Sequence, residues 1–318
     1  MTKRNICLVI GSNSFSGACL VDYLLNNKFK VIGLYKTKKE KKFLKFEKNK
    51  YIKNYVSLQF DLNLKKKNLL KIVRKYKPNY IVDFASLCLV NESWQNPELY
   101  MLTNVTNRLN FLKKISNESC LKKYIYISTP EVFGSSTKPQ RESSTMYNPS
   151  TPYAISKLAV ELYMKILNKN FNGKFIITRF SNFYGETQEQ HRLLPKLFKS
   201  ILSKNFFYLQ GDGSSKRNFI YDTDFCEGIY KTMQKGRIGK NYHFCSDEIN
   251  SIIKIIKLVC KISLINYDNL VKKIRDRVGK DQIYKLDCNK TKKELNWKPN
   301  VSLLQGINKL KYYYLGSK

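Results

Sequence analysis

The sequence predicts an α/β fold, in which helices cover both faces of a doubly wound parallel sheet and a smaller mixed α/β domain follows. The first observation is an alternation of segments rich in β-branched and aromatic residues with segments of helical period. The segments expected to be strands are 5–10, 30–35, 56–60, 80–84, 124–128 and 174–179. The segments expected to be helices are 18–25, 69–76, 101–115 and 151–168.

A second observation is the glycine-bearing turn after the first expected strand, which runs from Gly11 through Ser14 and Phe15 to Gly17. Gly11 permits a tight turn, and Gly17 permits close packing of the helix that begins here. The free amides at the start of that helix face an anion such as a pyrophosphate. The turn therefore indicates a Rossmann-like domain that binds a dinucleotide.

The alternation loosens after the last of these strands. Turn clusters such as residues 211–214 appear there between shorter elements, so a second and smaller domain is expected. The sequence contains neither an internal repeat nor a low-complexity linker. The 318 residues, 42% of them hydrophobic, are enough to bury a sizeable core.

The chain is strongly basic, with 58 Lys and Arg against 24 Asp and Glu and a formal net charge of +34. Such an excess is typical of proteins that bind nucleic acids or anionic membranes. Here the basic residues are spread along the whole chain and accompany many Asn, Ile, Tyr and Phe, the pattern that an A+T-rich coding sequence produces. We therefore expect no nucleic-acid partner and retain only a modest attraction for an anionic nucleotide.

The eight cysteines occur singly, without a Cys-x-x-Cys pair, and the chain has only two histidines. Neither a zinc site nor a disulfide framework is expected, so we predict no metal and reduced thiols. No apolar run approaches the ~18 residues that a membrane span requires. Residues 6–10 follow two basic residues as in a signal peptide, but the run is short and enters the glycine turn. A cytoplasmic protein without a membrane partner is expected.

Two short stretches carry the candidate chemistry: Ser-Thr-Pro-Glu-Val-Phe-Gly at 128–134 and Tyr-Ala-Ile-Ser-Lys at 153–157. Residues four apart lie on one helical face, so Lys157 is expected beside the Tyr153 phenol. A fixed positive charge favours the ionised phenol, so we expect the pKa of Tyr153 to fall below its usual ~10 and the phenol to accept a proton. The first stretch follows a strand, and it presents Thr129 and Glu131 where open α/β sheets place reactive groups.

Together with the glycine turn, these stretches resemble the extended short-chain dehydrogenase/reductase family, and within it the dTDP-glucose 4,6-dehydratases. The resemblance implies an enzyme with an NAD(P)-binding domain at 1–178 and a nucleotide-sugar-binding domain at 179–318, some of whose segments return to the first. It also implies catalytic roles. Tyr153 would take the proton of the sugar C4 hydroxyl, Lys157 would hold the nicotinamide ribose, and Thr129 would hydrogen-bond the C4 oxygen.

The same resemblance implies further cofactor contacts at the strand ends. They are Tyr35 and Lys36, Asp61 and Leu62, and Ala85 and Ser86. Ser14 replaces the middle glycine of the family's turn, which narrows the space for the pyrophosphate and adds a hydroxyl donor. Tyr35 stands where an acidic residue usually accepts the ribose hydroxyls of NAD, and the adjacent Lys36, Lys38 and Lys39 are able to accommodate a 2′-phosphate. NAD is the expected cofactor, and NADP is the alternative.

Glu131 is the expected base of an elimination. A ketone at C4 acidifies the C5 proton, so a carboxylate can remove it, water can leave from C6, and the stored hydride can return to C6. The dTDP-glucose enzymes carry Thr-Asp-Glu at this point, but this chain has Pro130 in place of the Asp that serves as the acid. GDP-mannose 4,6-dehydratases carry Thr-Ser-Glu and let the Glu both take and return the proton, so dehydration does not require that Asp.

The resemblance also implies five substrate contacts: Ser93, Asn182, Arg192, Arg217 and Arg277. Asn182 belongs to the pattern Arg-x-x-Asn-x-Tyr-Gly at 179–185, and Arg277 belongs to the carboxy-terminal signature at 276–299. The planar fork of an arginine suits the oxygens of a diphosphate. A nucleotide-diphosphate sugar is therefore the expected substrate.

The leading hypothesis is a nucleotide-sugar 4,6-dehydratase that makes a 4-keto-6-deoxy sugar for surface polysaccharide. A nucleotide-sugar C4 epimerase or a UDP-glucuronate decarboxylase-type enzyme, with the same hydride shuttle, is the alternative. Because Ser14, Tyr35 and Pro130 depart from the family pattern together, a catalytically silent cofactor-binding relative is a third hypothesis, and a basic nucleic-acid binder is a fourth. Relatives pair through a four-helix contact that includes the Tyr-x-x-x-Lys helix, so a homodimer is expected.

Overall fold

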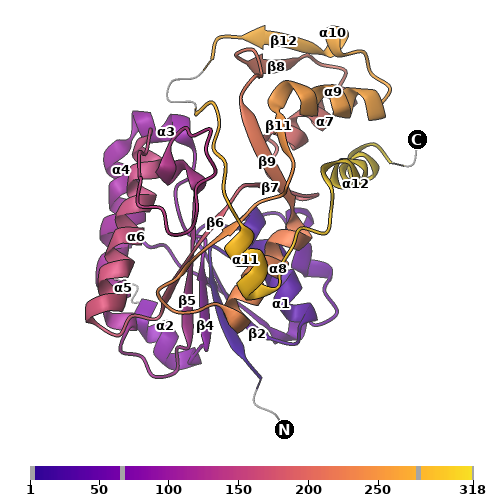
Figure 1. Ribbon diagram of the computed structural model, residues 1–318. Helices are drawn as coiled ribbons and strands as arrows, with labels where there is room; N and C mark the ends of the chain where they lie inside the picture. Colours follow the sequence, from indigo (N-terminus) through magenta and orange to yellow (C-terminus); the bar gives the residue numbers. More distant parts are fainter. Residues whose placement is uncertain (1–3, 65–68, 277–280, 317–318) are drawn as a thin grey trace.

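Seven parallel strands form the central sheet, in the order β10-β6-β5-β4-β1-β2-β3 (Figure 1). The computed structural model describes residues 4–64, 69–276 and 281–316. The strands are β1 (Ile6–Ile10), β2 (Lys30–Tyr35), β3 (Tyr55–Gln59), β4 (Tyr80–Asp83), β5 (Lys123–Ser128), β6 (Phe175–Phe180) and β10 (Asn241–Phe244). The sequence-predicted α/β fold is confirmed.

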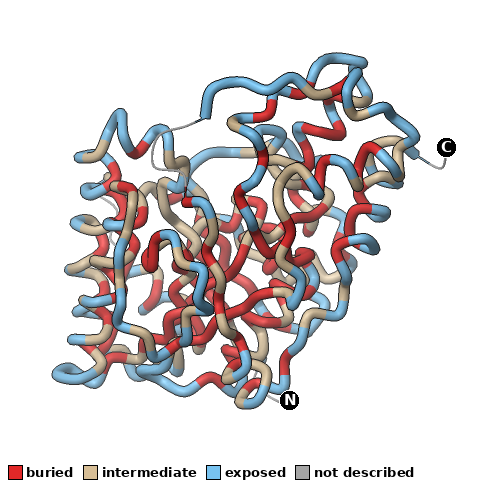
Figure 2. The backbone as a smooth tube through the Cα atoms, turned by 45° about the horizontal axis from the view of Figure 1, so that its top comes forward, coloured by how far each residue is buried: buried red, intermediate tan, exposed pale blue. Residues whose placement is uncertain are grey.

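Alternate residues of the strands supply two hydrophobic cores, because side chains along a strand point to opposite faces. Cys7 and Val9 of β1 pack on one face, and Leu8 and Ile10 pack on the other. The first core is covered by α1 (Phe15–Asn26), α8 (Asp222–Lys235) and α11 (Asn289–Leu295), and the second by α2 (Leu69–Tyr76), α5 (Asn107–Ile115) and α6 (Pro152–Asn170). Burial accordingly concentrates along the sheet, while the outer surfaces of the helices are exposed (Figure 2).

The second half of the chain builds a smaller layer above the carboxyl ends of the large sheet. Its strands are β7 (Asn182–Tyr184), β8 (Phe207–Gln210), β9 (Lys216–Tyr221), β11 (Ile249–Ser251) and β12 (Val271–Ile274), and its helices are α7 (Leu193–Leu202), α9 (Ile252–Ile262), α10 (Tyr267–Leu270) and α12 (Leu303–Leu315). All of these elements except β11 contribute residues to a third hydrophobic core. The chain crosses back to the large sheet, where β10 pairs in parallel with β6.

One expected helix differs from the sequence prediction. The helix expected at 101–115 is divided into α4 (Pro97–Met101), a π-helical turn η4 (Leu102–Thr106) and α5. Asn104 in the π-helical turn is buried and bonds to both backbone groups of Leu87 and to the Ser156 hydroxyl, so the widened turn ties the loop after β4 to α6. The lysine-rich segment after β2 forms three short 3-10 turns, η1 (Lys41–Phe43), η2 (Lys45–Lys48) and η3 (Ile52–Asn54).

Among the described residues, no helix has the length and apolar character needed to cross a bilayer.

A buried ion pair joins α6 to the large sheet. Arg179 of β6 and Glu161 of α6 are fully buried, and the Arg179 Nε donates to Glu161 Oε1 at 2.9 Å. The same guanidinium lies 2.8 Å from Nε2 of His243 on β10 and stacks over the Phe133 ring at 4.8 Å. Burial and the neighbouring Arg179 hold the pKa of His243 well below its usual range, so the imidazole is neutral and accepts this hydrogen bond. The Arg179 side chain thus connects β6 with α6, with β10 and with the turn that contains Phe133.

Replacing Glu161 by glutamine is expected to lower the free energy of unfolding by about 3–5 kcal/mol, because it leaves the Arg179 charge buried without a counter-ion. Urea denaturation followed by circular dichroism measures the change. The matched control is Arg74→Gln, which breaks the exposed pair between Arg74 and Glu118 and is expected to cost less than about 1 kcal/mol. Equal, small losses in both variants would contradict the structural role assigned to the buried pair.

Candidate active site

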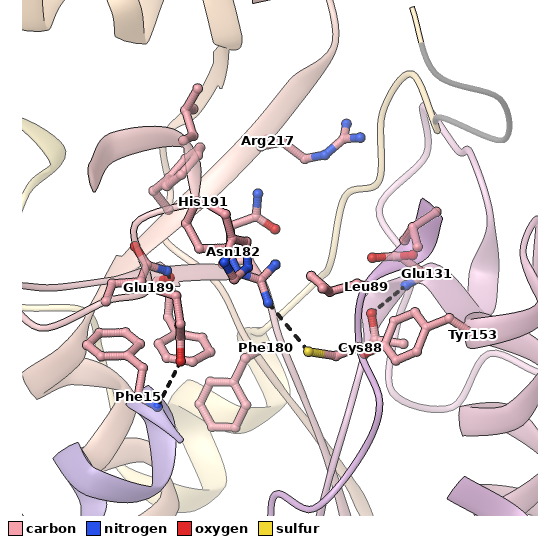
Figure 3. Close-up of a pocket in the computed structure, with 18 of the residues that line it drawn as sticks. Phe15, Cys88, Leu89, Glu131, Tyr153, Phe180, Asn182, Glu189, His191 and Arg217 are labelled. Carbon is pink, nitrogen blue, oxygen red and sulfur yellow. Dashed lines mark hydrogen bonds between the residues drawn. The ribbon is translucent and has the colours of Figure 1, made fainter. Parts of the chain in front are cut away.

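A cavity of about 740 Å³ opens above the carboxyl ends of β4, β5 and β6 and is closed on its other side by the second half of the chain (Figure 3). The expected catalytic residues Thr129, Glu131, Tyr153 and Lys157 all line it. Its far wall comes from β7, β8, β9 and the segment that leads into α7. Among the described residues, no group of three or more His, Cys, Asp or Glu is placed to hold a metal ion.

The turn after β5 is a 3-10 helix, η5 (Pro130–Phe133), and Thr129 caps it. The Thr129 Oγ1 accepts the backbone N–H of Glu131 at 3.3 Å, and Pro130 occupies the first position, where a missing N–H does no harm (Figure 3). The Thr129 hydroxyl also hydrogen-bonds the phenol of Tyr153. This short turn therefore holds a hydroxyl and a carboxylate next to the phenol.

The pKa of Tyr153 moves in the opposite direction to the sequence prediction. Burial of the phenol raises its pKa well above the usual value, and the negative charge of Glu131 raises it further, against a smaller lowering by the Thr129 hydrogen bond. The i, i+4 spacing of Tyr153 and Lys157 indicates a nearby positive charge but carries no information about burial of the phenol. The expectation of a lowered pKa is therefore wrong for the protein alone.

The Lys157 ammonium points toward the sheet. Its Nζ donates to the backbone oxygen of Ile127 at 2.7 Å and to the Ser86 hydroxyl at 2.9 Å, and it lies 4.1 Å from the centre of the Tyr126 ring. Burial and the nearby charge of Arg108 lower the pKa of Lys157 to about 7. Tyr153 and Lys157 share a helical face as predicted, yet the ammonium is directed at the ends of β4 and β5.

A buried network behind Lys157 holds this edge of the sheet. Asp83 accepts hydrogen bonds from Arg108 at 2.8 Å and from the Tyr124 hydroxyl at 2.5 Å, and its second oxygen accepts the Ala85 N–H at 3.0 Å. Arg108 also donates to the Ala85 carbonyl. No sequence pattern indicates this network, since its members are distant in the chain and lie in ordinary strand and helix patterns. It fixes the backbone that carries Ser86.

The glycine turn has the shape expected of a dinucleotide loop. Gly11 has φ +86°, and a Cβ on Gly17 would lie 2.2 Å from the Gly11 oxygen, so neither position accepts a side chain without a shift. Ser14 is the N-cap of α1: its Oγ accepts from Gly17 N at 3.0 Å and donates to the Gly11 oxygen at 2.7 Å. Its hydroxyl is thus used within the turn and does not supply the extra donor that we expected. The Phe15 N–H faces outward from the helix start.

The remaining residues expected to contact cofactor lie along the edge formed by β2, β3 and β4. Lys36 pairs with Asp61 at 3.4 Å, and Asp61 also accepts the Asn63 N–H at 2.9 Å. Leu62 and Ala85 pack against the second hydrophobic core, and Tyr35 ends β2. These residues do not line the cavity. They lie at the same edge of the large sheet, most of them on the strands beyond the glycine turn.

On the far wall, Tyr284 connects two of the expected substrate contacts. Its hydroxyl donates to Asn182 Oδ1 at 2.8 Å, and the Arg217 guanidinium lies 4.2 Å from the centre of its ring. Arg217 also donates to three backbone carbonyls, among them that of Asp281 at 2.6 Å. Arg192 lines the cavity with its guanidinium 3.5 Å from the Cys88 sulfur (Figure 3).

Two expected substrate contacts do not join this group. Ser93 is fully buried in α3 (Val90–Gln95), outside the cavity, and its hydroxyl donates to the Val90 oxygen at 2.7 Å. The Ser93 hydroxyl is bonded within its own helix, and the structure does not bring it together with the other expected substrate contacts. Arg277 lies outside the described residues.

Among the cavity residues that were not foreseen are Cys88, Glu189 and His191. Burial and the charge of Arg192 lower the pKa of His191. Glu189 and His191 lie in the loop between the Asn-x-Tyr-Gly pattern and Arg192. Their position between two predicted substrate contacts is the one sequence feature that could have indicated a place in the site. Cys88 carried none, since it follows β4 in an apolar stretch.

Comparisons with known proteins identify similar chains. A family model described as GDP-mannose 4,6 dehydratase matches residues 8–310. The dTDP-glucose 4,6-dehydratase of Haemophilus influenzae is 26% identical, over 97% of each chain. The crystal structure of a dTDP-glucose 4,6-dehydratase from Streptomyces venezuelae with NAD bound has a TM-score of 0.88 at 25% identity, covering 98% of this chain and 97% of that one. The UDP-glucuronic acid 4-epimerase of Bacillus cereus is alike in fold, with a TM-score of 0.87 at 24% identity over 98% of this chain and 99% of that one.

Replacing Lys157 by methionine is expected to change how stability depends on pH. With a folded pKa of about 7 and an unfolded pKa of about 10.4, only the unfolded parent protein binds this proton between those values. Between pH 7 and about pH 10.4, the free energy of unfolding of the parent therefore rises by up to about 1.4 kcal/mol per pH unit because of this group. Below about pH 7, the folded parent carries the full penalty of the buried ammonium. Urea unfolding at pH 6 to 10 should show the stability advantage of Lys157→Met shrinking as the pH rises.

The control for this titration is Lys169→Met, which removes an exposed lysine of the same helix. Its stability should follow the parent at every pH. A Lys157→Met profile parallel to that of the parent would mean that Lys157 keeps its charge in the folded protein at all of these pH values.

Proposed function

The chain belongs to the GDP-mannose 4,6 dehydratase family, and from this membership we propose that it is an NAD-dependent nucleotide-sugar 4,6-dehydratase of the dTDP-glucose type. The observation that carries the proposal is the pairing of Glu131 with Tyr153 in one cavity wall, joined by Thr129. A hydride shuttle at C4 requires the phenol. A carboxylate beside it serves the elimination, which an epimerase does not perform.

The residues present fit a dinucleotide. Besides the glycine turn, the hydroxyls of Ser128 and Ser181 line the cavity, are buried, and have no hydrogen-bond partner within the described part of the chain. Buried polar groups without a partner favour a polar ligand at that place. NAD is favoured over NADP because Lys36, the lysine next to Tyr35, is paired to Asp61 and is not free for a 2′-phosphate.

In the proposed first step, Tyr153 accepts the proton of the C4 hydroxyl while Thr129 holds the C4 oxygen. NAD, when bound, accepts and later returns the hydride and brings a positive charge to the phenol, which favours its ionised form. Lys157, anchored on Ile127 and Ser86, holds the ribose at the floor of the cavity. The raised pKa of the unliganded phenol makes this ionisation dependent on the bound cofactor.

In the proposed elimination, Glu131 takes the C5 proton made acidic by the C4 ketone. The same carboxyl group then gives its proton to the C6 hydroxyl, which leaves as water, so the second acid missing at Pro130 is not needed. The C6 carbon then receives the hydride and C5 receives a proton, which balances the one that Tyr153 took from the C4 hydroxyl, and the product is the 4-keto-6-deoxy sugar. The second candidate is a C4 epimerase, since the fold is also similar to that of the Bacillus cereus enzyme. An epimerase would use Tyr153 in the same way and would not need Glu131.

We predict that Tyr153→Phe loses about 10²- to 10⁴-fold in turnover, because the C4 proton then has no acceptor. Glu131→Gln is expected to keep hydride transfer, seen as reduced-nicotinamide absorbance, and to stop the loss of water. The assay incubates each protein with dTDP-, UDP-, GDP- and CDP-sugars and reads the products by mass spectrometry, with NMR for products of unchanged mass.

The matched control for the phenol is Tyr163→Phe, on the same helix outside the cavity. It is expected to leave turnover unchanged. If Glu131→Gln formed the full amount of product, Glu131 would not be the base. If the parent protein converted none of the sugars in the panel, the proposed activity would be refuted.

The proposal includes a homodimer formed by α4 and α6. These adjoining helices, at the left of Figure 1, expose six large apolar side chains: Leu99, Met101 and Leu102 of α4 and the turn after it, and Ile155, Leu162 and Ile166 of α6. The spacing of the three α6 residues puts them on one helical face. Such a contiguous apolar surface is typical of an interface between subunits.

The double substitution Leu162→Glu and Ile166→Glu is expected to convert the dimer into a monomer, since it puts two charges into the apolar contact. Light scattering coupled to size-exclusion chromatography gives the mass. Leu304→Glu, at a 49% exposed position of α12, is the control and should remain dimeric. A parent that elutes as a monomer at tens of micromolar would contradict the assembly.

A further inference from the structure

A carboxylate from the second half of the chain already occupies the start of α1. Glu189 lies in the loop between β7 and α7, and its Oε1 accepts the backbone N–H of Phe15 at 3.3 Å (Figure 3). The same oxygen lies 3.3 Å from the Nζ of Lys39, which follows β2. One oxygen of Glu189 thus faces a backbone donor and a cation, and both belong to the dinucleotide-binding half.

The surroundings of this carboxylate stabilise negative charge. Burial opposes ionisation of Glu189, but the charges of Lys39 and Arg192 and the hydrogen bonds outweigh it, and the pKa is lowered from its usual value. The amides at the start of α1 add the positive end of the helix dipole. Glu189 is therefore an anion at neutral pH, held where a helix start attracts anions.

A bound dinucleotide places its pyrophosphate at this same helix start. The Phe15 N–H can serve one acceptor, and a pyrophosphate next to an ionised carboxylate is repelled by it. Resting on the proposed function, we propose that Glu189 is an internal competitor of the cofactor: its carboxylate occupies the pyrophosphate position and must withdraw when the dinucleotide binds. Withdrawal leaves both the amide and the Lys39 ammonium to the incoming phosphates.

The rest of the fold confines this movement to the Glu189 loop. The segment that carries Lys39 is anchored a second time, through Lys45, whose Nζ lies 2.9 Å from the buried carboxylate of Asp222. The loop of Glu189 runs directly into Arg192, which lines the cavity beside Cys88. Cofactor binding that displaces Glu189 therefore also shifts the segment that precedes Arg192, and this couples the cofactor to the substrate wall.

Isothermal titration of the full chain with NAD and with ADP-ribose tests the competition, after any dinucleotide retained on purification has been measured and removed. Glu189→Gln and Glu189→Ala are expected to bind both ligands roughly tenfold more tightly than the parent, the effect of freeing one hydrogen bond to a charged group. The matched control is Glu186→Gln, in the same loop, whose carboxylate contacts the Tyr221 hydroxyl at 3.4 Å. It should bind NAD as the parent does.

Unchanged or weaker binding of NAD by both Glu189 variants, with melting temperatures near that of the parent, would overturn the competition and leave the proposed function intact. If the glutamine side chain still accepts the Phe15 N–H, the affinity of the alanine variant for NAD is the deciding measurement. Absence of NAD binding in the parent and in both variants would instead refute the NAD-dependent function and this inference with it.

Discussion

The ion pair between Arg179 and Glu161 sets the geometry on which the site depends. It is fully buried, so its charges are tolerated only in an arrangement that satisfies both of them. Glu161 lies one turn after Lys157 on α6, and Arg179 is the residue before the last of β6. The pair therefore fixes how α6 lies on the sheet, and with it the height of Tyr153 above the strand ends. Through the Phe133 ring, the same guanidinium supports the turn that carries Glu131.

Burial, more than the spacing of residues in the chain, determines the charge states in this site. Lys157 shares the Tyr126 ring with Arg108, which lies 5.5 Å from its centre, and both cations are almost wholly removed from water. In the unliganded protein, a lysine with its pKa near neutrality is only partly charged and a phenol with a raised pKa is uncharged. Charge supplied by a ligand therefore has a large effect here, because little solvent screens it.

The sequence pattern correctly predicted those helices and strands that depend only on their own residues. The bounds of β2 and α2 match the prediction, because a short apolar run and an amphipathic period are local properties. Pairing at a distance was not predictable: β10 is four residues long, and only its place beside β6 makes it part of the sheet. In the site, the gathering of Thr129, Glu131, Tyr153 and Lys157 followed from motif positions. The bonded state of the Ser14 and Ser93 hydroxyls did not, since each depends on which neighbour comes within reach.

The return of the chain to its first sheet has a consequence for its synthesis. The strand that completes the large sheet is made only after β7, β8 and β9, so a nascent chain that ends before it leaves one edge of β6 without its partner. An unpaired strand edge is open to wrong pairing with other chains. The two halves must therefore mature as a single cooperative unit, and a fragment cut at the apparent boundary between them would be prone to aggregate.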